Sequence, residues 1–198
     1  MGKAYENYIT KEQKTAIEQI PEHNRWGGYK NVAFNVSIWE SFWNDIYQGN
    51  KTDAILDYGA GAAWSQLVGR KLGYENISAV DIDTEEAIEQ FSRWHQILGN
   101  SVDHWDGVKM PYSDDMFDSI VAKASVTKLL KSSWDSFYSE MVRISKPNCK
   151  WYIAPVYMVQ RMPTPPPVFS EKKISILAWD WDRTHPCNDV FQPNMVDV

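Results

Sequence analysis

The sequence predicts an α/β fold in which helices cover both faces of one doubly wound, mostly parallel sheet. Four short apolar runs, at 54–58, 77–80, 118–122 and 151–154, are separated by stretches with helical periodicity. Strands that alternate with helices of this length are typical of βαβ units, whose crossovers make the strands parallel. In such a sheet, ligands bind outside the carboxyl ends of the strands, so the residues that follow each run are the candidates for function.

Two helices are expected ahead of the first strand. Thr10 and Gln13 are spaced as a capping box at the start of the first helix. Residues 22–34 contain two adjacent glycines and are expected to form a loop. Ser37 is then expected to cap a second helix, on which aromatic residues recur at helical spacing. We interpret residues 1–52 as an N-terminal helical segment that acts as a lid.

Residues 53–156 are expected to form the core of the fold. His95 lies on the apolar face of a predicted helix, which favours a packing role over a catalytic one. A turn at 146–148 is expected to separate the last helix from the fourth strand. Besides the four clear strands, the expected elements are helices at 62–72 and 84–98, a weak strand at 101–105, and a helix capped by Ser132.

Residues 157–198 form a C-terminal extension of a different character. A proline run at 163–167 cannot pair inside a sheet, and one further strand is predicted at 174–179. The sheet is therefore either shortened at its C-terminal strands or completed from residues 168–181. The extension could instead dock on a second copy, which makes a homodimer one expectation.

Composition excludes several classes of protein. The chain has 198 residues and a net charge of −6, which disfavours nucleic acid as a partner. No run of 18 apolar residues predicts a membrane span, and no cluster of residues predicts a metal site. Two cysteines without a CxxC pair indicate no disulfide framework, so a cytoplasmic location is expected. The 10 tryptophans favour cores, interfaces and ligand clefts, and name no function.

Three of the strand ends carry residues suited to a nucleoside. Glycines after the first strand, in the stretch 57–63, allow a tight turn and close approach of a ligand. Asp81 ends the second strand, where a carboxylate can accept both hydroxyls of a ribose. Asp106 follows Trp105, so that an acid and an indole ring could hold an adenine. Each feature also has a purely structural explanation, as a strand-to-helix turn, a helix cap and an Asp-Gly turn.

In this order and spacing, the motifs resemble those of the class I S-adenosylmethionine-dependent methyltransferases, which have a Rossmann-like fold. The sequence ILDYGAGAAW resembles the glycine-rich first motif of that family, and ISAVDID resembles the second. WDGVKMPYSDDMFDSIVAKASV and EMVRISKPNCKWYIAP resemble later motifs, with Asn148 in place of a glycine. The resemblance covers residues 53–156. The chief departure is Ala63, where many members have a third glycine.

The resemblance implies that the cofactor is S-adenosyl-L-methionine, and it implies a role for each motif. Asp81 would bind the ribose hydroxyls, and Asp106 with the backbone of Gly107 would meet the adenine. Lys123 would lie at the reacting end. The other residues expected to border the cofactor are Asp57, Gly59, Ala60, Gly61, Trp64, Ile82 and Trp105.

The function that this resemblance implies is in-line transfer of a methyl group to a small-molecule acceptor. Candidates for a catalytic base are His23, Tyr29 and Lys123, none of which stands out. Two alternatives remain open: a non-catalytic, regulatory protein that binds the cofactor, and an enzyme that uses the same cofactor for lysis or aminopropyl transfer. A nicotinamide cofactor is disfavoured because Trp64 stands where that fingerprint needs Gly or Ala.

Overall fold

A computed structural model describes residues 4–21, 27–82, 84–126, 129 and 131–180 of the chain. They form one six-stranded sheet in the order β3-β2-β1-β4-β5-β6, and every strand pairing among them is parallel. This confirms the predicted Rossmann-like, doubly wound sheet. The strands are β1 (Ile55–Tyr58), β2 (Ile77–Ile82), β3 (Asp103–Trp105), β4 (Phe117–Lys123), β5 (Ser145–Ala154) and β6 (Ser175–Ala178).

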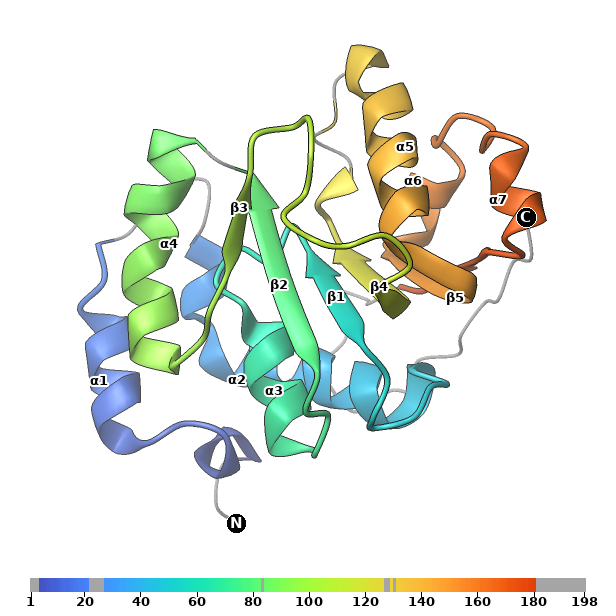
Figure 1. The fold of residues 1–198 in the computed structure, drawn as a ribbon. Helices are drawn as coiled ribbons and strands as arrows, with labels where there is room; N and C mark the ends of the chain where they lie inside the picture. The colour runs from blue at the N-terminus through green and yellow to red at the C-terminus, as the bar shows by residue number, and fades with distance from the viewer. Residues whose placement is uncertain (1–3, 22–26, 83, 127–128, 130, 181–198) are drawn as a thin grey trace.

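Helices from the first half of the chain cover one face of the sheet (Figure 1). Their core is aromatic: Phe42 packs edge-on against Tyr152 of β5 and lies beside Trp179, which follows β6. The indole N–H of Trp43 donates to the carbonyl of Ser65 at 3.1 Å. These helices are α1 (Lys11–Glu18), α2 (Val32–Ser41), its π-helical continuation η3 (Phe42–Ile46), α3 (Trp64–Lys71) and α4 (Glu85–Leu98).

The other face is covered by later elements. Phe137 of α5 (Trp134–Ile144) is fully buried against this face and packs on Tyr58 and Trp151. Phe169 of the short helix α7 (Val168–Glu171) packs edge-on against Trp151. One turn of helix, α6 (Val156–Val159), follows β5 directly. Single 3-10 turns complete the fold at η1 (Ala4–Asn7), η2 (Gly27–Lys30) and η5 (Lys131–Ser133).

Helix starts show where local signals suffice and where they do not. The capping box of Thr10 and Gln13 is present as predicted. The second helix, however, begins at Val32 rather than after Ser37. The side chain of Asn31 accepts the Phe34 N–H at 3.1 Å and caps it, which leaves Ser37 inside the helix. The predicted loop at 22–34 is therefore wrong at its last residues.

Two further boundaries differ from the prediction. The turn expected at 146–148 lies inside β5, which begins at Ser145 and pairs with Phe117 across an irregularity in the register. Asn148 takes φ +66° there, a conformation that asparagine tolerates. The expected cap Ser132 instead lies in a 3-10 turn, and the side chain of Ser133 at the cap position of α5 makes no capping bond.

The N-terminal segment, residues 1–52, and the C-terminal extension, residues 157–198, flank the core. The described helices of the N-terminal segment build the helical layer on one face, and Tyr29 of η2 contacts Gly61 at the carboxyl edge of the sheet. The predicted lid role of residues 1–52 stays a prediction. In the extension, β6 pairs with β5 close to the expected range. No helix in the described part of the chain has the length and apolar character needed to cross a bilayer.

Candidate active site

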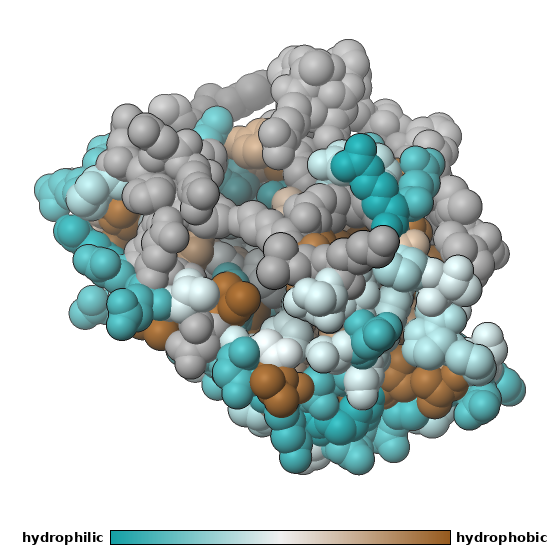
Figure 2. All heavy atoms as spheres, turned by 90° about the horizontal axis from the view of Figure 1, so that it is seen from above, coloured by the Kyte–Doolittle hydropathy of each residue, from teal (hydrophilic) through white to brown (hydrophobic). Residues whose placement is uncertain are grey.

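The carboxyl ends of the strands meet at the upper edge of the sheet in Figure 1. The strand order reverses between β1 and β4, and a ligand cleft is expected at such a switch point. Seen from above, the described surface is hydrophilic along much of its rim, and hydrophobic residues lie in separate groups (Figure 2). The turn after β1 lies at this edge, so the site is built from it outward.

This turn adopts left-handed backbone conformations at three alternate residues. The φ angles are +66° at Gly59, +53° at Gly61 and +57° at Ala63. Glycine accepts this region without cost, whereas an alanine pays roughly 1–2 kcal/mol. The N–H groups of Gly59 and Ala60 both donate to the carbonyl of Val80, at 2.8 and 3.1 Å. The turn is therefore tied to the end of β2, one strand away.

Two side chains approach the glycines so closely that no side chain could replace their hydrogens. A Cβ on Gly59 would collide with the Cβ of Ser125, whose hydroxyl donates to the carbonyl of Tyr58 at 2.9 Å. A Cβ on Gly61 would lie 2.5 Å from the hydroxyl oxygen of Tyr29. The glycines are thus favoured by packing from the loop that follows β4 and from the N-terminal segment, as well as by their φ angles.

The peptide of Gly61 is held from two sides. Its N–H donates to Asp81 Oδ2 at 2.6 Å, and its carbonyl lies 2.7 Å from His95 Nε2. Because a carbonyl can only accept, His95 must carry a proton on Nε2. Burial lowers the pKa of His95, which favours the neutral ring. The side-chain amide of Asn100 donates to the carbonyl of Ala63 at 2.8 Å, so α4 and the residues after it support the whole turn.

His95 was therefore only partly described by its sequence pattern. Its ring stacks on Phe91, as a residue on the apolar face of a helix should, but its nitrogen also fixes the turn. Asn100 and Ser125 are further contributors that sequence reasoning missed. No local signal marks them, because each acts on a partner more than 30 residues away.

Asp57 is a buried carboxylate at this edge. Its side chain is 2% exposed, and its Oδ2 has no hydrogen-bond partner among the described residues. Burial, reinforced by the nearby charge of Asp81, raises the pKa of Asp57 to about 7, while the charge of Lys123 opposes the shift. A hydrogen bond from the Ser65 side chain also opposes the shift. A buried carboxylate with one unpartnered oxygen is suited to a cationic or hydrogen-bond-donating ligand.

The acids at the ends of β2 and β3 differ in what they already bind. Asp81 is half-buried, and its Oδ1 accepts the N–H of Ile82 at 2.7 Å. Ile82 itself is half-exposed at the end of β2. Asp106 is exposed, and its Oδ1 accepts the backbone N–H groups of Val108 and Lys109, which lowers its pKa. Gly107 beside it has φ +88°.

The two tryptophans expected at the nucleoside are both buried. Trp64 begins α3 and packs edge-on against Trp94, whereas Trp105 ends β3 and packs against Tyr58 on the opposite face of the sheet. Neither indole N–H has a partner among the described residues. The structure thus brings the glycine turn, Asp57 and Asp81 together, and places the Trp105–Gly107 segment at the neighbouring strand end.

The three candidates for a catalytic base differ in where the structure places them. His23 lies outside the described residues. Burial, together with the charges of Asp81 and Asp57, raises the pKa of Tyr29, so its hydroxyl is suited to hydrogen bonding rather than to proton abstraction. Lys123 ends β4, pairs in register with Ala154 and lies close enough to Asp57 to lower that pKa. The described residues contain no group of three His, Cys, Asp or Glu placed to hold a metal ion.

Comparison with known proteins agrees with the motifs. Residues 56–153, about half of the chain, match the family model of a methyltransferase domain. This range runs from β1 to β5 and contains the glycine turn, Asp57 and Asp81. No curated protein sequence matches the chain.

Many solved structures are similar to this chain, and three of them serve as examples. A proposed S-adenosylmethionine-dependent methyltransferase of Methanococcus maripaludis is 17% identical, with a TM-score of 0.49 over 82% of this chain and 71% of its own. An S-adenosylmethionine-dependent methyltransferase of Aquifex aeolicus is 18% identical, with a TM-score of 0.48 over 90% and 80%. A proposed methyltransferase of Haloferax volcanii, solved with an activator, is 15% identical, with a TM-score of 0.49 over 72% and 59%. With TM-scores below 0.5, these likenesses carry no conclusion about substrate or partner.

Proposed function

We propose that this chain, which belongs to the class I S-adenosylmethionine-dependent methyltransferases and has S-adenosylmethionine as its cofactor, transfers the methyl group in line to a small-molecule acceptor. The net charge of −6 supports a small molecule over a nucleic acid. Family membership alone does not identify the acceptor as a small molecule.

The observation that carries the proposal is the unpartnered Oδ2 of buried Asp57. The cofactor's methionine part carries an ammonium group, and a cation beside this oxygen would offset the cost of the buried carboxylate. Asp81 keeps lone pairs that can accept ribose hydroxyls while it holds the Gly61 N–H. The residues present therefore fit the cofactor.

Each of the chain's own groups has a part in this proposal. S-adenosylmethionine, when bound, supplies a methyl group activated on a sulfonium, and displacement by the acceptor leaves a neutral thioether and frees the acceptor's proton. Tyr29 covers Gly61 and excludes water from the turn. Lys123, at the end of β4, lines the reacting end. Orientation and exclusion of water supply much of the acceleration, so no catalytic triad is required.

Binding of S-adenosylhomocysteine tests the proposal. It is measured by thermal unfolding and by calorimetry, and NAD is the comparison ligand. A ligand at 100 times its dissociation constant should stabilise the protein by about 2.7 kcal/mol. We expect this shift with the sulfur nucleoside only, and an affinity about 100-fold weaker in Asp81→Ala. Asp135→Ala, an exposed acid in the first turn of α5, is the matched control and should bind normally. A shift with NAD alone would overturn the proposal.

Two further features of the chain are proposed on narrower grounds. A reducing, cytoplasmic setting is supported by Cys149, a buried free thiol whose pKa burial raises to about 12. A homodimer through the C-terminal extension is supported by Tyr157 and Val168, which are large, exposed hydrophobic residues there. Sedimentation of wild-type protein and of a Tyr157→Ser, Val168→Ser variant tests the dimer, and a wild-type monomer would exclude it.

A further inference from the structure

A cavity of about 410 Å³ lies at the β6 edge of the sheet, away from the glycine turn. Its walls are α5, α6, the proline-containing segment that follows α6, and β6, all grouped at the right of Figure 1. Val156 and Val159 line it from α6, and Ile176 and Ala178 line it from β6. This volume lies within the range of small-molecule sites, which begins at about 300 Å³.

The cavity lies next to the carboxyl ends of β5 and β6. Its α6 wall begins two residues after Ala154, and Ala154 pairs in register with Lys123 of β4. Its β6 wall ends at Ala178, which pairs with Ile153. Because adjacent strands lie about 4.8 Å apart, the cavity is one to two strands from Lys123. The cavity lies on the α5 face of the sheet, where Tyr138, Ile176 and Ala178 belong to the core, whereas Ala154 belongs to the core on the other face. A molecule seated in the cavity would therefore meet the end of β4 around the carboxyl edge of the sheet.

The lining has polar groups but no charge. Seven of its ten residues are aliphatic, Met or Pro, and the other three are Tyr138, Gln160 and Thr164. A charged ligand seated here would find no counter-ion among the lining residues, which disfavours its binding. The Tyr138 hydroxyl donates to the carbonyl of Pro163 at 2.6 Å, and its oxygen keeps lone pairs that can accept. Burial raises the pKa of Tyr138 to about 12, so the group stays a neutral hydroxyl.

We infer that this cavity holds the uncharged, largely apolar body of the methyl acceptor, with the Tyr138 oxygen accepting a hydrogen bond from it. The inference rests on the proposed function, and it adds the chemical class of the acceptor. The methyl-accepting atom would project from the cavity toward the end of β4. A charged acceptor, such as a carboxylate or an amino acid, would be rejected by the lining.

Calorimetry with 2-naphthol and 2-naphthoate tests this inference, because the two probes share one apolar body and differ in charge. Both are titrated into wild-type protein in the presence of saturating S-adenosylhomocysteine. We expect 2-naphthol to bind, and 2-naphthoate to bind at least tenfold more weakly. Equal binding of the two probes, or no binding of 2-naphthol, would overturn the inference.

A filled cavity provides the second arm. Met162 lines the cavity, whereas Val168 is exposed and does not. Met162→Trp should weaken 2-naphthol at least tenfold and leave S-adenosylhomocysteine unchanged, and Val168→Trp should alter neither. Val156→Phe replaces Met162→Trp if the latter fails to fold.

The outcomes separate the two proposals. Normal binding of S-adenosylhomocysteine with undiminished 2-naphthol binding in the filled variant rejects the cavity alone. Loss of S-adenosylhomocysteine binding in wild-type protein rejects the proposed function. A wild-type dimer that becomes monomeric in Met162→Trp would show that a second copy occupies the cavity, and would also overturn the inference.

Discussion

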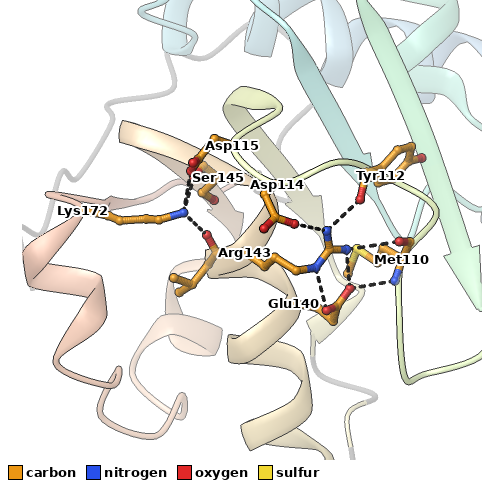
Figure 3. Close-up of polar contacts among 9 residues, drawn as sticks. Met110, Tyr112, Asp114, Asp115, Glu140, Arg143, Ser145 and Lys172 are labelled. Atoms are coloured by element: carbon orange, nitrogen blue, oxygen red, sulfur yellow. Dashed lines mark hydrogen bonds and ion pairs between the residues drawn. The ribbon is translucent and has the colours of Figure 1, made fainter.

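Two groups of ionisable side chains lie at opposite edges of the sheet, and they differ in whether their polar atoms have partners. The carboxyl-edge group consists of Asp57, Asp81 and His95. The amino-edge group consists of Asp114, Asp115, Glu140, Arg143 and Lys172, and Figure 3 shows how its members converge. The first group leaves a buried carboxylate oxygen without a partner, whereas every charge in the second is paired.

The amino-edge group is a structural clamp. Arg143 donates to both oxygens of Glu140, to Asp114, and to the carbonyls of Met110 and Tyr112 (Figure 3). Glu140 in turn accepts the Met110 N–H at 2.8 Å. The clamp therefore fixes the segment between β3 and β4. The hydrogen bonds that Glu140 accepts from Arg143 lower the pKa of Glu140, whereas the pKa of Asp57 is raised.

A high density of charged side chains therefore does not by itself mark a ligand-binding site. Paired charges with satisfied hydrogen bonds hold a fold together, whereas a buried charge without a partner costs stability until a ligand arrives.

The largest expected effect concerns Asp57 and pH. Its pKa rises from 3.8 to about 7 on folding, so the folded state binds more protons between these values. The free energy of unfolding should therefore fall as pH rises from about 4 to about 7, by an amount on the order of 4 kcal/mol from this group alone. Asp57→Asn should remove that fall.

Urea unfolding at pH 5, 6, 7 and 8 measures this effect. The free energy of unfolding of Asp57→Asn should increase relative to that of wild type as pH rises, and this difference should become constant above pH 7. Saturating S-adenosylhomocysteine should reduce the difference, because its ammonium offsets the carboxylate. Parallel pH profiles for the two proteins would show that Asp57 does not titrate as its burial implies.

Arg143→Ala should give the next largest effect, on stability rather than on binding. Removing the guanidinium leaves Glu140 without its counter-ion, and the Glu140 side chain is only 10% exposed. The free energy of unfolding should therefore fall by about 3 kcal/mol. The affinity for S-adenosylhomocysteine should change less than threefold, because the clamp lies at the other edge.

Lys146→Ala is the matched control for the clamp. Lys146 also pairs with an acid, Asp118, at 2.7 Å, but both side chains are more than a third exposed. Unfolding free energies from urea titration should therefore show a smaller loss than in Arg143→Ala. If the two variants lose equal stability, the amino-edge group is not the clamp described above.

The smallest effect is expected at His95. His95→Leu removes the donor to the Gly61 carbonyl and keeps an apolar side chain against Phe91. The affinity for S-adenosylhomocysteine should fall about tenfold, which corresponds to about 1.4 kcal/mol. His95→Gln, which can still donate a hydrogen bond, should recover part of the loss in calorimetry. Unchanged binding in His95→Leu would assign the residue to packing alone.

The sequence predicted the parts of this molecule that depend on neighbours along the chain. The capping box at Thr10 and the alternation of strands and helices are local patterns, and the structure contains them. The start of the second helix and that of β5 were predicted wrongly, because they depend on which cap or strand partner is available. Asn31 supplied the cap, and Phe117 supplied a partner for Ser145.

The site divides in the same way. Residue types and spacing along the chain were enough to propose the glycine turn and Asp81, because each lies at the end of a strand, and the resemblance to the methyltransferase family added Asp57. Only the tertiary structure brought His95 to Gly61, left Oδ2 of Asp57 without a hydrogen-bond partner among the described residues, and formed the cavity at β6. The physical reason is that hydrogen bonding, burial and enclosed volume are set by residues far apart in the chain, and these meet only when the sheet and its two helical layers pack.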